Sequence, residues 1–523
     1  MASQVIRTHY LPVMTADSAA LYSALAARDP RFDGVFFVGV TSTGIYCRPV
    51  CTAKTPKAAN CRFFASAEQA EKSNFRPCLR CRPELAPGRA PVDDAHRIAG
   101  MIAQRIAEGG TERAGVETIA AQFGWSSRQI RRMLQKELGV SPMELVLTRR
   151  LLLAKQLLTE TALPVTEVAF ASGFASLRRF NDAFNRRYGM APTGFRRAVV
   201  DRAAGSARGR FDSGTFTLQL GYRSPFDWEG LLAFLKLRTL RGVEVVDDSS
   251  YSRTVRVGGH AGWLRVTDAP EKRTLMVELT HSLTPVLPAV LGRLRHLFDL
   301  AARPDVIEAH LARSATLQSS IARHAGLRVP GAFDGFELAM RAVLGQQVTV
   351  KAATTIAGRV VEAFGDPMMP PHAGLTHHSP SAERIAALST DDLAACGIPR
   401  TRAASIVAIA GELVAGRMRL EPGAPDEETI RQLIALPGIG AWTASYIAMR
   451  ALRSPDAFPK EDVVLQKVLG GVSAKRADEL SQEWRPWRSY ATLHLWRSSS
   501  ASTDKLSMSR PIVATAARRP PSK

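Results

Sequence analysis

Apolar residues recur at helical spacing along most of the chain, and three stretches without this period interrupt it. Residues 87–92 are rich in proline and glycine, and residues 201–214 are rich in glycine, serine and arginine. Such compositions are typical of joints between domains. Residues 366–382 are loop-like but lie between two apolar helical patterns, so we interpret them as an insertion within a domain. In this interpretation three histidines belong to a solvated loop rather than to a metal site: His372, His377 and His378.

The segment between the first two joints contains an internal repeat. Residues 119–142 recur as residues 168–192, with an alanine, a glycine and a proline at matching positions of both copies. Each copy predicts a short helix, a turn at the glycine and a second helix with a basic face, and residues 143–160 predict a long connecting helix. The pattern therefore predicts two helix-turn-helix units, a motif that places its second helix in the major groove of DNA.

Length and composition limit the class of protein. The chain has 523 residues, enough for about three to four domains. Hydrophobic residues make up 46% and charged residues 22%, which excludes a disordered or fibrous chain. No window approaches the roughly 18 apolar residues of a membrane span, and the N-terminus lacks a basic stretch followed by an apolar one. We therefore expect a cytoplasmic protein without a membrane partner.

The net charge of +21 is unevenly distributed. Residues 1–90 carry 12 basic and 6 acidic residues, and residues 91–200 carry 16 and 10. An excess of this kind favours a polyanionic partner, with double-stranded DNA first and an anionic membrane surface second, since no basic amphipathic helix stands out. The charge therefore supports the helix-turn-helix prediction.

Four of the six cysteines form two closely spaced pairs. Cys47 and Cys51 are separated by three residues, and Cys78 and Cys81 by two. In a reducing compartment, two such pairs favour a tetrahedral zinc ion bound by thiolates over disulfides. We therefore predict one zinc ion in the N-terminal domain. Cys61 falls outside the paired spacing, and we interpret it as a packing residue.

The residues around these pairs carry a resemblance to a known family. The first pair lies in STGIYCRPVC and the second in FRPCLRC, and RDPRFDGVFFVGV precedes both. Residues 15–85 resemble the Ada-type methylphosphotriester methyltransferase domain. The resemblance implies that Cys47 is both a zinc ligand and the nucleophile that accepts a methyl group. The transfer would be stoichiometric, because a thioether offers no easy route back. Nearby arginines suit the phosphate backbone that presents the methyl group.

The repeat, within residues 93–197, resembles the AraC-type DNA-binding domain. Side chains suited to base edges and phosphates lie on its second helices: Arg128, Arg131 and Arg132 in the first copy, and Arg178, Arg179 and Asn181 in the second. The resemblance implies a nucleoid-associated transcriptional activator that binds a promoter operator and contacts RNA polymerase.

A third motif lies near the C-terminus. The run LPGIG at residues 436–440 stands between two helical patterns and predicts a helix-hairpin-helix, in which Gly438 and Gly440 let backbone amides approach a DNA phosphate. Alone, this motif indicates only contact with the DNA backbone. An enzyme is indicated because FPKEDVVL supplies an acid, Asp462, 22 residues after Gly440. The neighbouring Glu461 is the rival assignment and would point about 100° away on the same helix.

Residues 214–497 resemble the AlkA-type 3-methyladenine DNA glycosylases of the helix-hairpin-helix superfamily. The shared motifs are SPFDWEGLLAFL, RAVLGQQVTV, LPGIGAWTASY and EWRPWRSYATLHLW. The resemblance implies that Asp462 is the catalytic carboxylate and that Gln347 is the wedge inserted where the flipped base was. It also implies that the base pocket is lined by Trp442, Tyr446, Trp496 and Phe234.

These residue types suit the chemistry of alkylated bases. Such a base is cationic, and aromatic faces bind cations with about 0.5–2 kcal/mol per ring. It is also a good leaving group, so a carboxylate near the sugar is sufficient and the glycosylase needs no cofactor. Trp442 occupies the position where lyase-active relatives have a lysine, which predicts a monofunctional enzyme. Val463 and Gln347 depart from the usual aromatic and leucine, so the range of bases stays open.

These features together predict a multidomain, mainly α fold with α+β parts. A small zinc-bound α/β domain, an all-α double helix-turn-helix and an antiparallel β-sheet subdomain precede a helix-hairpin-helix α-bundle. The expected bounds are 1–88, 93–200, a linker at 201–213, 214–290, 291–497 and a disordered basic tail at 498–523. The sequence contains no motif for a second active cysteine, and the remaining cysteine, Cys396, lies at the end of an apolar helix. Direct repair of O6-methylguanine is therefore not predicted.

These interpretations together give the hypothesis that one chain is an alkylation-damage sensor, a transcriptional regulator and a glycosylase. One alternative is a DNA-binding regulator whose glycosylase-like domain is catalytically silent. Another is a pure repair enzyme in which the helix-turn-helix pair only raises the affinity for DNA. An acid at Asp462 beside an intact hairpin speaks against the first alternative, and the second stays open.

Overall fold

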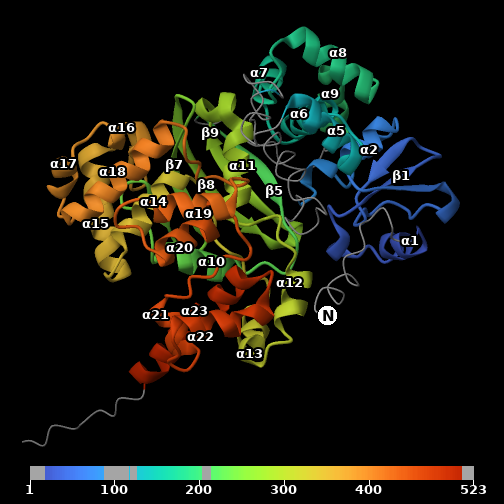
Figure 1. The fold of residues 1–523 in the computed structure, drawn as a ribbon. Coiled ribbons are helices and arrows are strands. Elements are labelled where there is room, and N and C mark those ends of the chain that lie inside the picture. The colour runs from blue at the N-terminus through green and yellow to red at the C-terminus, as the bar shows by residue number, and fades with distance from the viewer. Residues whose placement is uncertain (1–17, 88–116, 118–125, 203–213, 509–523) are drawn as a thin grey trace, which may run out of the picture.

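A small four-stranded sheet forms the first domain of the protein, which we describe from a computed structural model over residues 18–87, 117, 126–202 and 214–508 (Figure 1). The sheet has the order β3–β1–β2–β4, antiparallel except for the β2–β4 pair. Its elements are α1 (Ser18–Ala26), β1 (Phe37–Val40), β2 (Ile45–Cys47), β3 (Cys61–Phe64), α2 (Ala67–Lys72) and β4 (Arg76–Pro77). Phe37, Tyr46, Phe64 and Phe75 form its core. The predicted α/β domain is confirmed.

The helical segment that follows shows the repeat in its caps. Its helices are α5 (Ser127–Leu138), α6 (Pro142–Glu160), α7 (Val165–Ala171), α8 (Leu177–Tyr188) and α9 (Pro192–Arg202). Helices α5 and α8 begin after serine caps and both end at a left-handed glycine, Gly139 (φ 69°) and Gly189 (φ 70°). The long connecting helix was predicted correctly as α6. The first helix of the first copy and residues 203–213 of the linker lie outside the described residues.

A five-stranded antiparallel sheet of order β5–β9–β8–β7–β6 begins the C-terminal half. Its strands are β5 (Thr215–Gly221), β6 (Glu244–Val246), β7 (Ser250–Val257), β8 (His260–Ala269) and β9 (Thr274–Thr280). Helices α10 (Trp228–Lys236) and α11 (Leu287–Leu297) share a hydrophobic core with this sheet. Alternating buried residues along β5, such as Phe216, Leu218 and Leu220, fit a strand with one face on the core.

A helical bundle completes the fold and holds the hairpin. Its helices are α12 (Pro304–Leu311), α13 (Ala315–Arg323), α14 (Gly335–Leu344), α15 (Val350–Phe364), α16 (Ala382–Ala386), α17 (Thr390–Ala394), α18 (Arg400–Val414), α19 (Asp426–Ile434), α20 (Ala441–Ala451), α21 (Val463–Val468), α22 (Ala474–Ser481) and α23 (Arg488–Met508). Helix α14 packs against both α18 and α20, and Met340, Ile406 and Ile447 are fully buried there. The predicted antiparallel sheet and helical bundle are confirmed.

Two expectations about irregular segments are wrong. Residues 366–378 form a hairpin of β10 (Asp366–His372) and β11 (Leu375–His378) rather than a solvated loop, and β11 lies against β7. His372 stacks on Trp263 at 4.0 Å, and His378 is buried. Helix α23 also continues to residue 508, past the expected start of the tail at 498, while residues 509–523 lie outside the described residues. Within the described parts of the chain, every helix is too short or too polar to cross a membrane.

Candidate active site and metal centre

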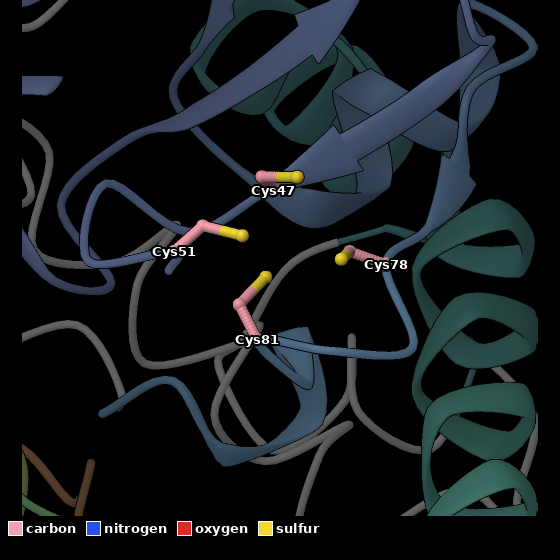
Figure 2. Close-up of side chains that lie close together, drawn as sticks. All are labelled: Cys47, Cys51, Cys78 and Cys81. Atoms are coloured by element: carbon pink, nitrogen blue, oxygen red, sulfur yellow. The ribbon is translucent and has the colours of Figure 1, made fainter. Parts of the chain in front are cut away.

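Four cysteine side chains converge in the first domain. Cys47 ends β2, Cys51 lies in the loop that follows, and Cys78 and Cys81 come directly after β4. Their sulfur atoms lie within 4.8 Å of one another and point toward a common centre (Figure 2). The structure thus brings together the four predicted ligands. Cys61 lies apart at the start of β3, half-buried, with its thiol directed at a backbone carbonyl rather than packed in the core as expected.

The donor set fits a zinc ion. Four sulfurs at about 2.3 Å from a tetrahedral zinc would lie about 3.8 Å apart, near the observed spacing. Two backbone N–H groups donate to ligand sulfurs, from Arg48 to Cys81 Sγ at 3.3 Å and from Arg80 to Cys78 Sγ at 3.4 Å. Such donors orient thiolate ligands and reduce their mutual repulsion. A soft divalent cation suits four sulfurs held in this way.

The predicted DNA-contacting side chains lie on the exposed faces of α5 and α8. The opposite faces are buried through Ile130 and Leu134 in α5 and through Phe180 and Phe184 in α8. Arg131 also lies 3.6 Å from Glu117 in an exposed ion pair. The side chains free of the core are Arg128, Arg131, Arg132, Arg178, Arg179 and Asn181. Both helices therefore present a basic surface suited to DNA.

The hairpin between α19 and α20 has the shape that its glycines require. Gly438 has φ +76°, and a Cβ there would lie 2.5 Å from Ser405 Oγ. Gly440 precedes α20 with φ −90°, and a Cβ there would meet nothing within 4 Å. Gln346 donates from Nε2 to the carbonyl of Gly438 at 3.0 Å and to Thr443 Oγ1 at 3.0 Å. The conformation needs glycine at 438, whereas the space around 440 is open.

The carboxylate of Asp462 is buried at the start of α21. Its Oδ1 accepts from the backbone N–H of Leu465 at 2.9 Å, so Asp462 caps the helix. Trp442 Nε1 donates to Oδ2 at 2.9 Å, and Trp496 Nε1 donates to Oδ1 at 3.3 Å. The neighbouring Glu461 lies before the helix rather than on it, so the expected 100° relation between the two acids is wrong. The arrangement keeps one anionic group fixed beside two aromatic rings.

Aromatic rings gather around this carboxylate. Trp442 and Tyr446 lie one turn apart on α20 and are parallel, with an interplanar angle of 8° and ring centres 5.4 Å apart. Trp496 of α23 is tilted to Tyr446 at 6.3 Å. Phe234 of α10 lies near Tyr446 across Arg450, whose Cζ is 5.1 Å from the ring centre of Phe234 and 5.5 Å from that of Tyr446. The four rings predicted for the pocket come from three helices, and Tyr446 contacts both Trp442 and Trp496.

Two arginines that the sequence analysis did not single out border these rings. Arg450 Nη1 donates to the hydroxyl of Tyr446 at 2.7 Å, and Arg238 Cζ lies 3.8 Å from the ring centre of Phe234. Burial opposes ionisation of the phenol, but Arg450 and Arg238 hold the pKa of Tyr446 below its ordinary value. The spacing of four residues from Tyr446 to Arg450 on one helix could have indicated this pair.

The predicted wedge residue, Gln347, lies three residues after the end of α14. Gln347 is exposed and has φ +54°, a left-handed conformation that is uncommon outside glycine. The backbone therefore directs this residue away from the helix and into solvent, where DNA could meet it. The adjacent Gln346, which braces the hairpin, was also missed by the sequence analysis. Its signal was the doubled glutamine of RAVLGQQVTV.

Family models match four parts of the chain. They describe the metal binding domain of Ada (residues 20–84), a helix-turn-helix domain (119–198), the AlkA N-terminal domain (217–334) and the HhH-GPD superfamily of base excision DNA repair proteins (340–487). A Mycobacterium tuberculosis protein named "Probable bifunctional transcriptional activator/DNA repair enzyme AlkA" is 39% identical over 487 residues, which cover 92% of this chain and 97% of that protein. The chain belongs to this family.

Other relatives match parts of the chain. The Escherichia coli protein "DNA-3-methyladenine glycosylase 2" is 33% identical over 279 residues, covering 53% of this chain and 95% of that protein. The Bacillus subtilis "Bifunctional transcriptional activator/DNA repair enzyme AdaA" is 32% identical over 177 residues, covering 34% and 81%. The predicted union of Ada-type, helix-turn-helix and AlkA-type domains is confirmed, as are a zinc site in the first domain and DNA as a partner.

Proposed function

We propose that this family member responds to DNA alkylation in three ways. It removes alkylated bases such as 3-methyladenine from duplex DNA, takes methyl groups from phosphotriesters onto Cys47, and activates transcription through its two helix-turn-helix units. The observation that carries the glycosylase assignment is the buried carboxylate of Asp462, which is held by two indole N–H groups beside stacked rings. A carboxylate fixed in this way beside aromatic rings suits the task of stabilising positive charge.

Excision follows from this geometry. A cationic base would stack against Trp442 and Tyr446, whose faces attract its charge. As the bond between the sugar and the base breaks, its electron pair goes to the base and positive charge develops on the sugar. Asp462 stabilises that charge, and water then adds to the sugar and loses a proton to the solvent. Trp442 offers no amine, so base release occurs without strand cleavage.

DNA would reach this site from the side of the hairpin. A Cβ on Gly440 would meet nothing within 4 Å, so the start of α20 is open at this residue, and the first amides of the helix would bind a phosphate there. Gln347, exposed just after α14, would fill the gap in the duplex once a base has turned outward. Gln346 would keep the hairpin and the wedge in a fixed relation, because it bonds to Gly438 and Thr443.

Single-turnover release of 3-methyladenine from methylated duplex DNA tests the assignment. Asp462→Asn keeps the size and most hydrogen bonds of the side chain but removes its charge, so release should fall by at least about 100-fold. Glu461→Gln is the matched control and should be nearly silent. DNA binding should survive in both variants. Loss of activity in Glu461→Gln with normal activity in Asp462→Asn would reassign the acid, and normal activity in both variants would refute a catalytic carboxylate at either position.

The second activity is methyl transfer to Cys47, and the cluster of four cysteines within the Ada-type domain favours it. When bound, zinc would keep the sulfur of Cys47 as a thiolate at neutral pH. That sulfur attacks the methyl carbon of a phosphotriester, so an S–C bond forms and the C–O bond breaks. Its electron pair stays on the phosphate oxygen, and a phosphodiester anion leaves. The cluster thereby loses one negative charge, which should raise affinity for DNA.

Mass spectrometry after incubation with methylphosphotriester DNA tests this step. The added methyl should be found on Cys47, and the methylated protein should bind its operator more tightly by a factor that shrinks at high salt. A methyl on Cys51, Cys78 or Cys81 would overturn the choice of nucleophile. Equal operator affinity of both forms would refute the switch.

Regulation through the helix-turn-helix pair would use the exposed arginines of α5 and α8, with an operator and RNA polymerase as partners in the cytoplasm and at the nucleoid. The alternatives are a regulator with a silent glycosylase-like domain and a repair enzyme whose helices only add affinity. Transcription of a reporter distinguishes them. Arg178→Ala with Arg179→Ala should abolish induction after alkylation and leave excision on short duplexes intact, whereas a pure repair enzyme would show no induction at all.

A further inference from the structure

Arg48, which directly follows Cys47, is tied to two sites beside the metal centre. Its Nε donates to Asp33 Oδ1 at 2.8 Å, and its Nη2 bonds to the other oxygen of that carboxylate. Its Nη1 donates to the carbonyl of Cys81 at 3.1 Å, and its backbone N–H donates to the sulfur of Cys81. Asp33 is 6% exposed. The orientation of Arg48, and with it the link between the two ligand loops, therefore depends on Asp33.

Asp33 is held in turn by a residue of the glycosylase half. Arg223, just after β5, donates from Nε to the backbone carbonyl of Asp33 at 3.0 Å and from Nη1 to the carbonyl of Ala301 at 2.7 Å. Its side chain is almost completely buried, with a residue exposure of 2%. One guanidinium thus joins the two domains by hydrogen bonds to backbone groups, which cannot rotate away as side chains can.

A parallel path starts beside the other ligand pair. Arg82, which follows Cys81, forms an ion pair with Glu160 at the end of α6. The other carboxylate oxygen of Glu160 accepts from the backbone N–H of Gln219 in β5 at 2.9 Å. Both arginines that follow zinc-ligand cysteines are therefore connected to positions 219 and 223 of the same strand region.

Between these two positions the domains touch backbone to backbone. A Cβ on Gly221 would lie 1.9 Å from the carbonyl oxygen of Leu85. No side chain fits there, and the contact leaves no room for water. Residues 221 and 223 lie on the same face of an extended segment, and that face meets the Ada-type domain, whereas Gln219 contacts α6 through Glu160.

We infer that Arg223 of the glycosylase half is a positioning residue of the methyl-acceptor centre. It fixes Asp33, Asp33 fixes Arg48, and Arg48 holds the loops of Cys47 and Cys81 together. Without Arg223, the buried carbonyl of Asp33 loses its partner and the carboxylate that orients Arg48 becomes mobile. By reciprocity, binding of zinc stabilises the contact at β5. The part that concerns methyl transfer rests on the proposed function, whereas the part that concerns zinc does not.

The rate of zinc release from the full chain to an excess of a colorimetric chelator tests this inference. Arg223→Met should release zinc at least about tenfold faster than the unaltered protein, because it removes hydrogen bonds of a charged group. Arg223→Lys, which keeps the charge but not the fork of donors, should lie between the two. The matched control is Val266→Ala in the buried middle of β8, which weakens the sheet away from the Ada-type domain and should leave the release rate unchanged.

A double-mutant cycle tests the path. If Arg223 acts through Asp33, adding Arg223→Met to Asp33→Asn should accelerate release little beyond the faster of the two single variants. Removal of zinc should also speed amide exchange at residues 215–221 more than at residues 250–257. Equal rates of zinc release from Arg223→Met and Val266→Ala would overturn the inference. So would amide exchange in β5 that does not change when zinc is removed.

Methyl transfer separates the two proposals. Arg223→Met should also slow methylation of Cys47. Absence of methylation in the unaltered protein, with faster zinc release in Arg223→Met, would refute the proposed methyltransferase and leave the positioning role standing. Normal methylation together with normal zinc release in Arg223→Met would refute the positioning role and leave the proposed methyltransferase standing. Should Arg223→Met fail to fold, Arg223→Lys and Asp33→Asn carry the same comparison.

Discussion

The indole N–H of Trp442 donates a 2.9 Å hydrogen bond to Oδ2 of Asp462, so the ring that stacks on Tyr446 also holds the acid. Oδ1 of the same carboxylate has two donors, Leu465 N–H and the indole of Trp496. Trp442 therefore has two tasks that a substitution can separate. Phenylalanine keeps the aromatic face but has no N–H.

Trp442→Phe should slow single-turnover base release by about tenfold or more, the scale of one hydrogen bond to a charged group. Trp496→Phe should have a smaller effect, because its bond to Asp462 is longer, at 3.3 Å, and Oδ1 keeps the donor of Leu465. Rapid-quench measurement of both variants on the same methylated duplex gives the comparison. Full activity in Trp442→Phe together with loss in Trp442→Ala would show that only the ring matters.

The two hairpin glycines should differ when replaced by alanine. Gly438→Ala combines a left-handed backbone with a contact at Ser405 Oγ, so it should lower stability by about 1–2 kcal/mol or more. Gly440→Ala meets neither obstacle and should unfold nearly as the unaltered protein does. Its added methyl would instead stand where a phosphate approaches, so affinity for duplex DNA should fall. Thermal unfolding and fluorescence anisotropy separate these effects, and normal affinity in Gly440→Ala would contradict phosphate binding at this turn.

The cysteine cluster predicts the metal content of the purified protein. We expect about one zinc per chain, bound by four sulfurs at roughly 2.3 Å. Elemental analysis gives the stoichiometry, and X-ray absorption at the zinc edge gives the ligands. Cys78→Ser should lower the zinc content, whereas Cys61→Ser should not, because Cys61 lies outside the cluster. An iron chromophore, or loss of zinc in Cys61→Ser, would contradict the ligand set.

The parts of the protein that could be predicted from sequence are those that local signals specify. The repeat, the cysteine pairs and the glycines of the hairpin each act over a few residues, so their elements were foreseen. The hairpin at residues 366–378 was not, since three prolines obscure its strands. It is defined by its packing against the sheet, because β11 lies against β7, Leu375 is fully buried and Trp263 stacks on His372.

The site shows the same division. Its candidate residues were predicted from motifs and resemblance, but their hydrogen bonds join distant parts of the chain. Trp496 lies 34 residues after Asp462, and no spacing rule connects them. Arg223 and Asp33 are 190 residues apart, and their bond depends on how two domains dock. The register of such contacts is a tertiary property, which propensities and periodicity do not contain.

The buried carboxylate of Glu71, between the first domain and helices α6 and α8, predicts that the stability of the protein depends on pH. Glu71 is 1% exposed and accepts hydrogen bonds from Tyr46 at 3.0 Å and Thr148 at 2.9 Å. Arg187 of α8 donates to its backbone carbonyl at 2.7 Å and pairs with its carboxylate at 3.4 Å. Burial raises the pKa of Glu71 to about 7, although Arg187 opposes the rise.

The sign of the effect follows from where the proton is held. In the unfolded chain this carboxyl ionises near pH 4.5, so between about pH 4.5 and 7 the folded protein keeps a proton that the unfolded chain has lost. The contribution of Glu71 to stability is therefore full below this window and disappears as the pH rises through it, by on the order of 3 kcal/mol for a fully buried group. Glu71→Gln has no proton to lose, so it should be more stable than the unaltered protein at about pH 8 and similar to it at about pH 5. Thermal unfolding at both pH values measures this difference, with Glu167→Gln, an exposed acid of α7, as the control. A gap between Glu71→Gln and the unaltered protein that does not widen with pH would mean that Glu71 stays ionised in the fold, with Arg187 outweighing the cost of burial.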